Sequence, residues 1–559
     1  MTSRVYEIAS EYVDRAAAMH PLGATSMGVS GHDHEMTDFS PQAEDARAAY
    51  EREALTALEA APLEGERDRI AQAAMAERLR LHLEMHEAGE QYQSLNILFS
   101  PLQDIRQGFD LMPRDTEEAW RNIAARLSLV PFGLQTYRQT LEEGVRRGLP
   151  STRRQTEQCA EQAVVWSGQR AGVPPFFDSL LEAYDAAGIG SAALRGDIEA
   201  GVRAAADGYA AMGRFLADDY LPKTEPRDAV GPDRYSRSVR SYNGIELNLL
   251  ETYAWGWDEL QRIEREVGAT CERILPGGDI EAVQRLLEED PARSIEGVDN
   301  FQRWMQELQD RTIEEFDGVH FDIPEPVKRL EAMIAPAGGA LAMYYTGPSE
   351  DFSRPGRTWY PTGGKTRFPL WGEVSIAYHE GVPGHHLQIG HVTYLSESLS
   401  RWQRLLGTTS GYAEGWALYA ERLMAELGYL ENPDYYLGML RAQALRAARV
   451  VVDIGLHLEL SIPTAERYHP GEAWTPELAH EFLVQRTYFP ENFLASEVTR
   501  YLGMPGQAIS YKVGERAWFE ARERARKRDG AAFNLKDFHM RAFDLGPMGL
   551  ELMGRELGG

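Results

Sequence analysis

Cysteine is scarce in this sequence, with only Cys159 and Cys271 among 559 residues. Two cysteines so far apart exclude a disulfide framework and a cysteine-based metal site, and they favour a reducing compartment. Basic residues are also in short supply, because 58 Lys and Arg stand against 86 Asp and Glu, for a net charge of −28. A chain this acidic is not expected to bind nucleic acid or an anionic membrane surface.

Long apolar runs are missing as well. No segment stays apolar over the length that a bilayer requires, and residues 1–23 lack the apolar stretch of a signal peptide. We therefore predict a cytoplasmic protein with no membrane partner. Nothing in the composition specifies an oligomeric state.

Strand signals are few, and helical periodicity dominates instead. Ala, Leu and Met recur at three- and four-residue spacing among Glu and Arg, which is typical of amphipathic helices. The pattern predicts helices at 42–61, 64–88, 116–147, 153–171, 175–187, 192–221, 245–273, 280–289, 295–316, 411–427, 433–460, 475–485, 490–501, 506–528 and 535–545. We therefore expect a mainly α fold with a small β-sheet, in one large enzyme fold rather than several small domains.

Four stretches depart from this pattern. Residues 1–40 are expected to be irregular, and residues 338–348 (GGALAMYYTGP) have the composition of a short strand. Residues 353–369 are rich in Gly and Pro and predict a loop before a helix that begins near Trp371. Residues 221–237 resemble a linker, which suggests a two-lobed chain with an N-terminal helical lobe at 1–230 and a catalytic lobe at 231–559. An Ω-loop inside one domain is the alternative.

The most informative stretch is AYHEGVPGHHLQ, residues 377–388. A His-Glu pair followed by Gly-His indicates a zinc hydrolase, in which histidines hold the metal and the glutamate handles the proton of a metal-bound water. The spacing is not that of His-Glu-x-x-His, however. Four residues after His379 stands Pro383, and the next histidines, His385 and His386, follow at i+6 and i+7.

A third ligand must come from elsewhere, because catalytic zinc commonly takes three protein ligands and leaves one position to water. The segment GYAEGWALYAERLMAE offers Glu414 and Glu421, which are seven residues apart and so share one helical face. A carboxylate on such an apolar helix would be compensated by the metal. The alternative is that both are surface carboxylates with Arg422 as a neighbour.

These motifs carry a resemblance. HEGVPGHHLQ, AEGWALYAE, EVTRYLGMPGQAISYKVGE and FNLKDFHMRAFDLGPMGL resemble, in this order, the bacterial domain-of-unknown-function family 885. That family is grouped with the gluzincin zinc metallopeptidases, which include angiotensin-converting-enzyme-like and oligopeptidase-like helical members. The resemblance spans residues 344–549, whereas the N-terminal helical half resembles the family only loosely. It implies a large helical gluzincin-like metallopeptidase fold with a small β-sheet beside the active-site cleft.

The resemblance also implies residue roles. His379 and a second motif histidine would bind Zn²⁺ with Glu414 as the third ligand, and Glu380 would act as general base and then general acid. For the second histidine we favour His385, with the helix bulged at residues 381–383. His386 is the alternative.

By the same resemblance, a tyrosine would stabilise the tetrahedral oxyanion. Tyr501 is the first choice and Tyr511 the second. Arg500 could hold an anion or a substrate carboxylate, with a structural ion pair as the alternative. His539 is predicted to be structural.

The strand that contains Tyr344 and Tyr345 would offer its edge to a peptide-like substrate. The leading hypothesis is therefore a zinc-dependent hydrolase of peptide or peptide-like amide bonds, whose partner is a small peptide or amide substrate. A hydrolase of a non-peptide amide, ester or lactam is the alternative, since a fold does not fix a substrate. A non-catalytic binding protein is disfavoured, because a degenerate site would be expected to lose at least one of these residues.

Overall fold

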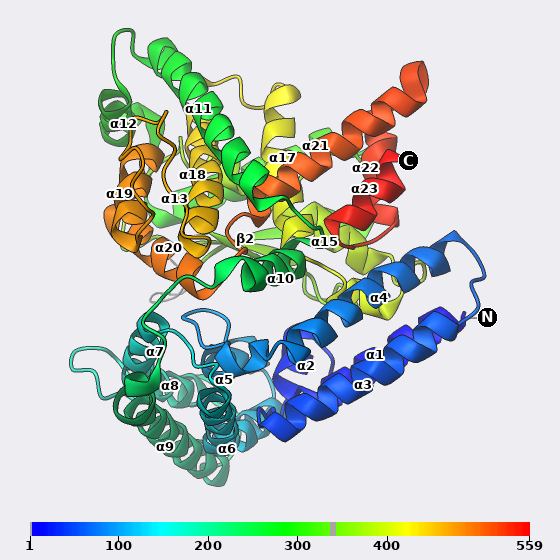
Figure 1. Cartoon of the computed structure of the whole chain (residues 1–559), viewed down its shortest axis with the longest axis vertical. Coiled ribbons are helices and arrows are strands. Elements are labelled where there is room, and N and C mark those ends of the chain that lie inside the picture. The colour runs from blue at the N-terminus through cyan, green and yellow to red at the C-terminus, as the bar shows by residue number, and fades with distance from the viewer. Residues whose placement is uncertain (1–2, 336–342) are drawn as a thin grey trace. The chain divides into compact units, whose positions relative to one another are not determined.

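Residues 3–335 and 343–559 are described by the computed structural model of the chain (Figure 1). Helices dominate and the strands are short, so the predicted mainly α class with small sheets is confirmed. Within these residues, no helix combines the length and apolar character needed to cross a bilayer. The chain divides into two compact units: the first comprises Met1–Glu64, Arg78–Val230 and Ser496–Met504, and the second Gly65–Glu77, Gly231–Ala495 and Pro505–Gly559. Two helices contribute to both units, α4 (Glu66–Glu87) and α20 (Glu491–Gly503).

The first unit contains the long helix α6, Glu117–Arg147. Thr116 caps its start by accepting a hydrogen bond from the N–H of Ala119, and Gly148 ends it in the left-handed conformation. Its buried face packs chiefly against α9, Ala192–Arg214. The remaining helices and turns of this unit are α1 (Arg4–Met19), α2 (Pro21–Met27), α3 (Pro41–Ala60), η1 (Glu90–Gln93), α5 (Pro101–Leu111), α7 (Arg153–Trp166), α8 (Asp178–Ala187), η2 (Phe215–Tyr220) and η3 (Leu221–Lys223).

The prediction that residues 1–40 are irregular is wrong, because α1 and α2 lie there. Ser3 caps α1, which buries a face that includes Val5, Ile8 and Tyr12. Pro21 stands in the first turn of α2, where its missing N–H costs no hydrogen bond. The Gly, Ser and His residues that suggested a loop gather at and beyond the end of α2, so they mark a helix end.

The second unit contains α17 (Ser410–Glu426) and α18 (Pro433–His457). α17 packs along α21 (Ser510–Asp529), and α18 along α11 (Leu249–Ile274) (Figure 1). α18 is rich in Ala, Val and Leu and is buried on most of its surface, as expected of a helix that is apolar nearly all round. The other helices and turns are α10 (Gly231–Asn243), α12 (Ile280–Glu289), η4 (Pro291–Arg293), α13 (Val298–Phe316), η5 (Glu325–Lys328), α14 (Val374–Glu380), α15 (His385–Tyr394), α16 (Arg401–Leu406), α19 (Pro476–Thr487), η6 (Gly530–Ala532), α22 (Leu535–Asp544) and α23 (Leu550–Gly558).

Two small sheets belong to the second unit. β1 (Ser294–Glu296) pairs antiparallel with β5 (Arg367–Pro369). In the three-stranded sheet, β4 (Gly356–Tyr360) lies between β2 (Leu330–Ile334), which is parallel to it, and β3 (Tyr344–Thr346), which is antiparallel. The predicted strand at 338–348 contains β3, whereas residues 338–342 lie outside the described residues.

The predicted loop at 353–369 is wrong, because it contains β4 and β5. Every second residue of β4 is buried, namely Gly356, Thr358 and Tyr360. This alternation is that of a half-buried strand, but it is only five residues long and Gly and Pro flank it. The Gly and Pro residues therefore led to the prediction of a loop instead of a strand.

Candidate metal centre

The histidine motif is divided between two helices. His379 lies in the last turn of α14, and His385 begins α15. Residues 381–384 link them, with a cis peptide bond between Val382 and Pro383. The bulged helix that we predicted is thus a complete break, and it turns two histidines that are six residues apart toward one point.

The break depends on two glycines in close contact with their surroundings. A Cβ atom on Gly384 would lie 1.9 Å from the carbonyl oxygen of His379. A Cβ atom on Gly381 would lie 2.1 Å from Oε1 of Gln309. Real Cβ atoms do not approach other atoms so closely. At Gly384 the close atoms belong to the backbone, so a larger residue requires a shift of the chain, whereas at Gly381 a movement of the Gln309 side chain would suffice.

Two side chains hold the break from outside the motif. Nε2 of Gln309, on α13, donates a hydrogen bond to the carbonyl of Ala377 at 2.9 Å. The indole N–H of Trp416, on α17, donates to the carbonyl of Pro383 at 2.9 Å. Both side chains are buried. The Ala377 carbonyl also accepts the helical hydrogen bond from the N–H of Gly381 at 2.9 Å, so Gln309 adds a second donor there. Trp416 gives the Pro383 carbonyl, in the link between the helices, a partner without water.

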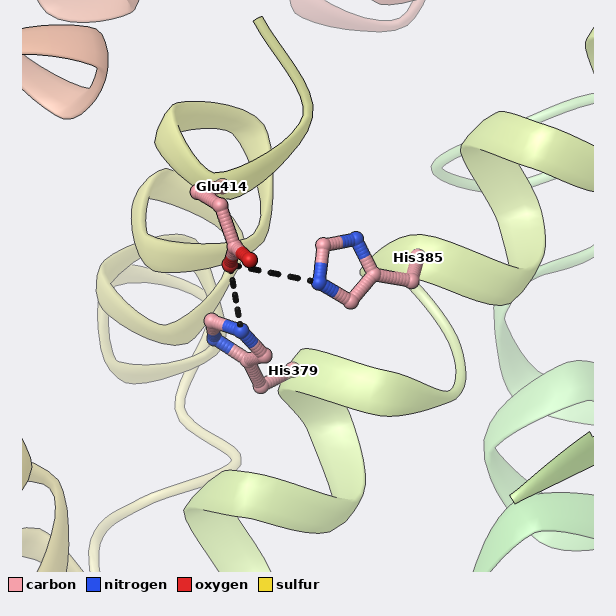
Figure 2. A group of neighbouring side chains, drawn as sticks. All are labelled: His379, His385 and Glu414. Atoms are coloured by element: carbon pink, nitrogen blue, oxygen red, sulfur yellow. Dashed lines mark hydrogen bonds and ion pairs between the residues drawn. The ribbon is translucent and has the colours of Figure 1, made fainter. Parts of the chain in front are cut away.

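The metal-ligand candidates meet between α14, α15 and α17 (Figure 2). Nε2 of His379 lies 3.3 Å from Oε2 of Glu414, and Nε2 of His385 lies 3.4 Å from the same oxygen. One ligand atom from each of the three residues lies within 4.8 Å of the others. The structure therefore brings His379, His385 and Glu414 into one group that could hold a metal ion.

Glu421 contacts the ring nitrogen of His379 that does not face Glu414. Its Oε1 accepts a hydrogen bond from Nδ1 of His379 at 2.8 Å, and its Oε2 accepts one from the hydroxyl of Ser375 at 2.7 Å. The Glu421 side chain is fully buried. A carboxylate in this position fixes the ring of His379 and leaves Nε2 to face Glu414, which is how metal-ligating histidines are usually oriented.

Negative charge dominates the electrostatics of the group. Burial by itself lowers the pKa of His379, but its hydrogen bonds to Glu414 and Glu421 outweigh burial and raise the pKa to about 10. Burial would raise the pKa of Glu414, whereas the hydrogen bonds to His379 and His385 hold that pKa well below its usual range. The carboxylates thus create a site that favours a cation.

The donor set fits zinc. Two imidazole nitrogens and one carboxylate oxygen are the ligands of many catalytic zinc sites, and each bonds zinc at about 2.0–2.1 Å. Two ligand atoms at that distance from a tetrahedral ion are about 3.3–3.4 Å apart. The separations of Glu414 Oε2 from the two histidine nitrogens match this spacing.

His386 lies outside the group, although it follows His385 directly. Its Nε2 donates to the carbonyl of Val327 at 2.7 Å, and its Nδ1 accepts from the hydroxyl of Tyr345 at 3.0 Å. Burial lowers the pKa of His386 to about 4, so the ring is neutral. Both nitrogens are engaged, and the ring connects α15 to β3 and η5.

Glu380 follows His379 and is buried. Burial raises the pKa of its carboxyl, while the charges of His385, His379 and Arg446 oppose that rise. Across the described residues, the Glu380 carboxylate makes no hydrogen bond or ion pair. It is therefore not committed to a structural partner.

Tyr511, at the start of α21, faces the metal group. Its ring is stacked with the ring of His379 at a centroid distance of 6.5 Å. The guanidinium groups of Arg449 and Arg446, both on α18, lie 4.7 and 5.6 Å from the Tyr511 ring centre. Sequence reasoning had no signal for either arginine, because α18 carries no recognisable motif.

Tyr501 and Arg500 belong to the first unit, on the last turns of α20. The hydroxyl of Tyr501 donates to Oε2 of Glu497 at 2.7 Å, and Arg500 lies 3.3 Å from the same oxygen. The roles predicted for these two residues stay predictions.

The two predicted substrate-binding tyrosines lie on β3. Tyr344 stacks on Trp359 of β4 with ring centres 5.8 Å apart, and Tyr345 bonds to His386. Among the described strands, β3 pairs only with β4, so it is an edge strand of its sheet. Its use by a substrate stays a prediction.

Together, fold and site define a mainly helical protein with small sheets and a His/His/Glu group suited to a metal ion. The chain belongs to a family described as bacterial protein of unknown function, DUF885, whose sequence pattern matches residues 21–557. No match was found among curated proteins.

Two solved structures share the fold. One, from Colwellia psychrerythraea and provisionally described as a lipoprotein, has a TM-score of 0.83 and 22% identity over 100% of this chain and 99% of that one. The other, from Shewanella oneidensis and provisionally described as a lipoprotein of unknown function, has a TM-score of 0.74 and 17% identity over 99% of this chain and 100% of that one. At such identities the likeness concerns the fold alone.

Proposed function

We propose that this protein is a zinc-dependent hydrolase of peptide or peptide-like amide bonds, of the gluzincin type. The observation that carries the proposal is the convergence of His379, His385 and Glu414, next to the uncommitted carboxylate of Glu380. When bound, zinc supplies a Lewis acid that polarises a carbonyl group and lowers the pKa of a water molecule.

The residues of the chain perform the remaining steps. Glu380 accepts the proton of the attacking water and delivers it to the leaving nitrogen, as general base and then general acid. A tyrosine hydroxyl donates a hydrogen bond to the developing oxyanion. Tyr511 and Tyr501 are the candidates, and the stacking of Tyr511 on His379 favours Tyr511.

The decisive test replaces Glu380 with Gln and leaves the ligands intact. We expect the purified wild-type protein to contain zinc by elemental analysis and to hydrolyse members of a peptide library. Glu380→Gln should keep the zinc and lose hydrolysis by about 10²–10⁴-fold, the usual contribution of a general base. Glu397→Gln, which changes an exposed glutamate, is the matched control.

Two results would contradict the proposal. Retained activity in Glu380→Gln would remove the role of Glu380, and a wild-type protein without bound metal would remove the zinc site. Amide, ester and lactam compounds should be assayed beside the peptides, because a hydrolase dedicated to one of them would leave the peptide library intact.

Cellular location is part of the proposal. Both cysteines are free and buried, which agrees with a reducing cytoplasm. The cell envelope is the alternative location, because the two structural relatives are described as lipoproteins. Fractionation of cells that express the untagged full-length protein decides between the two locations.

A further inference from the structure

Arg446 is a cation close to the metal group, and it forms no ion pair with any carboxylate of the described residues. It lies on α18, which packs against α14, the helix that carries His379 and Glu380. Its guanidinium carbon lies 5.6 Å from the ring centre of Tyr511, and that ring is stacked on His379 at 6.5 Å. Its charge also acts on the Glu380 carboxyl.

The hydrogen bonds of Arg446 are incomplete. Its Nη1 donates to the carbonyl of Ala442 in its own helix at 3.3 Å, and its Nε is buried without a partner. No carboxylate within the described part of the chain forms an ion pair with it. By contrast, two other arginines of the second unit are paired: Arg422 with Glu266 at 2.8 Å and Arg522 with Glu426 at 2.9 Å.

Carboxylate partners are plentiful in a chain with 86 acidic and 58 basic residues, yet Arg446 forms no ion pair within the described residues. A guanidinium group offers a planar fork of N–H donors that matches a carboxylate in two parallel hydrogen bonds. A half-buried arginine beside a reaction centre, with donors unused, is therefore suited to an anionic group of a ligand.

We propose that Arg446 binds the free carboxylate of the substrate, so that the enzyme acts on short peptides or N-acyl amino acids that end close to the scissile amide. This inference rests on the proposed hydrolase function and adds the class of substrate to it. An extended peptide advances about 3.3–3.6 Å per residue, so the distance from Arg446 past Tyr511 to His379 is at most about three to four residues. The carboxylate therefore lies within that number of residues of the bond that is cleaved.

The test compares N-benzoyl alanine peptides of one to four residues, each as the free acid and as the C-terminal amide. Binding is measured by calorimetry on the zinc-loaded Glu380→Gln protein, with and without Arg446→Gln, and hydrolysis is measured on the same pairs with intact Glu380. We expect the acid of at least one length to bind more tightly than its amide. Arg446→Gln should reduce that preference by about ten- to a hundredfold, as for loss of a charge-assisted hydrogen bond.

Two control variants accompany this test. Arg516→Gln changes an arginine of α21 that already pairs with Glu520 at 2.8 Å, and it should leave the preference unchanged. Arg446→Lys keeps the charge without the fork and should restore part of the preference. Zinc content and melting temperature confirm that each variant is folded and loaded.

The outcomes separate the inference from the proposed function. Tighter binding of acids through Arg446 without hydrolysis of any compound would contradict the hydrolase and support the arginine site. The inference is overturned if wild-type Arg446 gives acids no advantage over amides. It is also overturned if Arg446→Gln weakens acids and amides equally, which would mean that Arg446 only positions Tyr511.

Discussion

Nδ1 of His379 donates a hydrogen bond to the buried carboxylate of Glu421 at 2.8 Å, and Glu421 lies two helical turns after Glu414 on α17. One helix face therefore supplies both the candidate metal ligand and the group that orients a second ligand. The seven-residue spacing makes this arrangement possible, because it returns a side chain to nearly the same face.

Replacement of Glu421 tests this relationship. Glu421→Gln keeps the size of the side chain but removes the charge that supports His379. We expect the affinity for zinc to fall by about 10–100-fold, which is typical for loss of a partner of a metal-bound histidine. Competition with a chelator of known affinity measures the change.

The control for this prediction is Glu426→Gln, on the same helix. Glu426 pairs with Arg522 at 2.9 Å on the surface, so its loss should leave zinc affinity unchanged. Equal zinc affinity in Glu421→Gln and wild type would show that Glu421 does not support the metal site.

Gly384 gives a prediction about the break between α14 and α15. An alanine there would place its Cβ 1.9 Å from the carbonyl oxygen of His379, and a backbone atom cannot move aside as a flexible side chain can. We expect Gly384→Ala to lower the free energy of unfolding by about 1–3 kcal/mol or more. It should also weaken zinc binding, because His385 follows directly. Thermal unfolding and elemental analysis measure both effects.

Gly268→Ala is the matched substitution. Gly268 lies on an exposed face of α11, with no atom within 4 Å of the Cβ position. An alanine there should stabilise the helix by about 0.5–1 kcal/mol. Unchanged or increased stability in Gly384→Ala, as in Gly268→Ala, would mean that the structure relieves the close approach at Gly384.

The metal group could be predicted from the sequence because its residues lie in short motifs. His379 and His385 are in one stretch, and Glu414 and Glu421 share a helical period. The choice of His385 over His386 required the resemblance, since spacing alone left both open. The structure shows the physical reason for the difference: the chain breaks before His385, and His386 turns toward Val327 and Tyr345.

Contacts between distant segments could not be predicted. Gln309 bonds to Ala377, Trp416 bonds to Pro383, and Arg446 lies beside Tyr511. Only the packing of helices brings the two residues of each of these contacts together. The helical class followed from periodicity, whereas α1 and β4 were missed because Gly, Ser and Pro beside them carried stronger local signals than the elements themselves. Local composition outweighed periodicity in both cases.

His539 gives a prediction about pH. It is buried, and its Nε2 bonds to the hydroxyl of Tyr419 at 2.8 Å. Burial, with the nearby charges of Arg522 and His320, lowers its pKa to about 3, against about 6.5 in an unfolded chain. A lowered histidine pKa means that its stabilising effect is complete above pH 6.5 and is lost as the pH falls toward 3. At pH 5 the loss is about 2 kcal/mol.

His539→Gln keeps a hydrogen-bonding group but cannot take up the proton. The decrease in the free energy of unfolding between pH 7 and pH 5 should therefore be about 2 kcal/mol smaller in this variant than in the wild type. Urea unfolding at both pH values, in chelator so that metal does not contribute, gives the comparison. His34→Gln, which changes an exposed histidine, should keep the wild-type dependence. An unchanged dependence in His539→Gln would show that this residue does not limit stability in acid.

The two candidate tyrosines are distinguished by the removal of one hydroxyl at a time. Tyr511→Phe keeps the ring that stacks on His379 and against Arg449, so zinc affinity and KM should change little. If the Tyr511 hydroxyl stabilises the oxyanion, kcat should fall by about 10²–10³-fold, because the interaction is made only in the transition state. Tyr501→Phe removes a hydroxyl that donates to Glu497 within α20, and kcat should fall less than tenfold. The reverse order would assign the oxyanion to Tyr501, and small effects in both variants would mean that neither hydroxyl takes part. Because both substitutions remove a single oxygen atom, a difference between them reports the position of the hydroxyl rather than the loss of an aromatic ring.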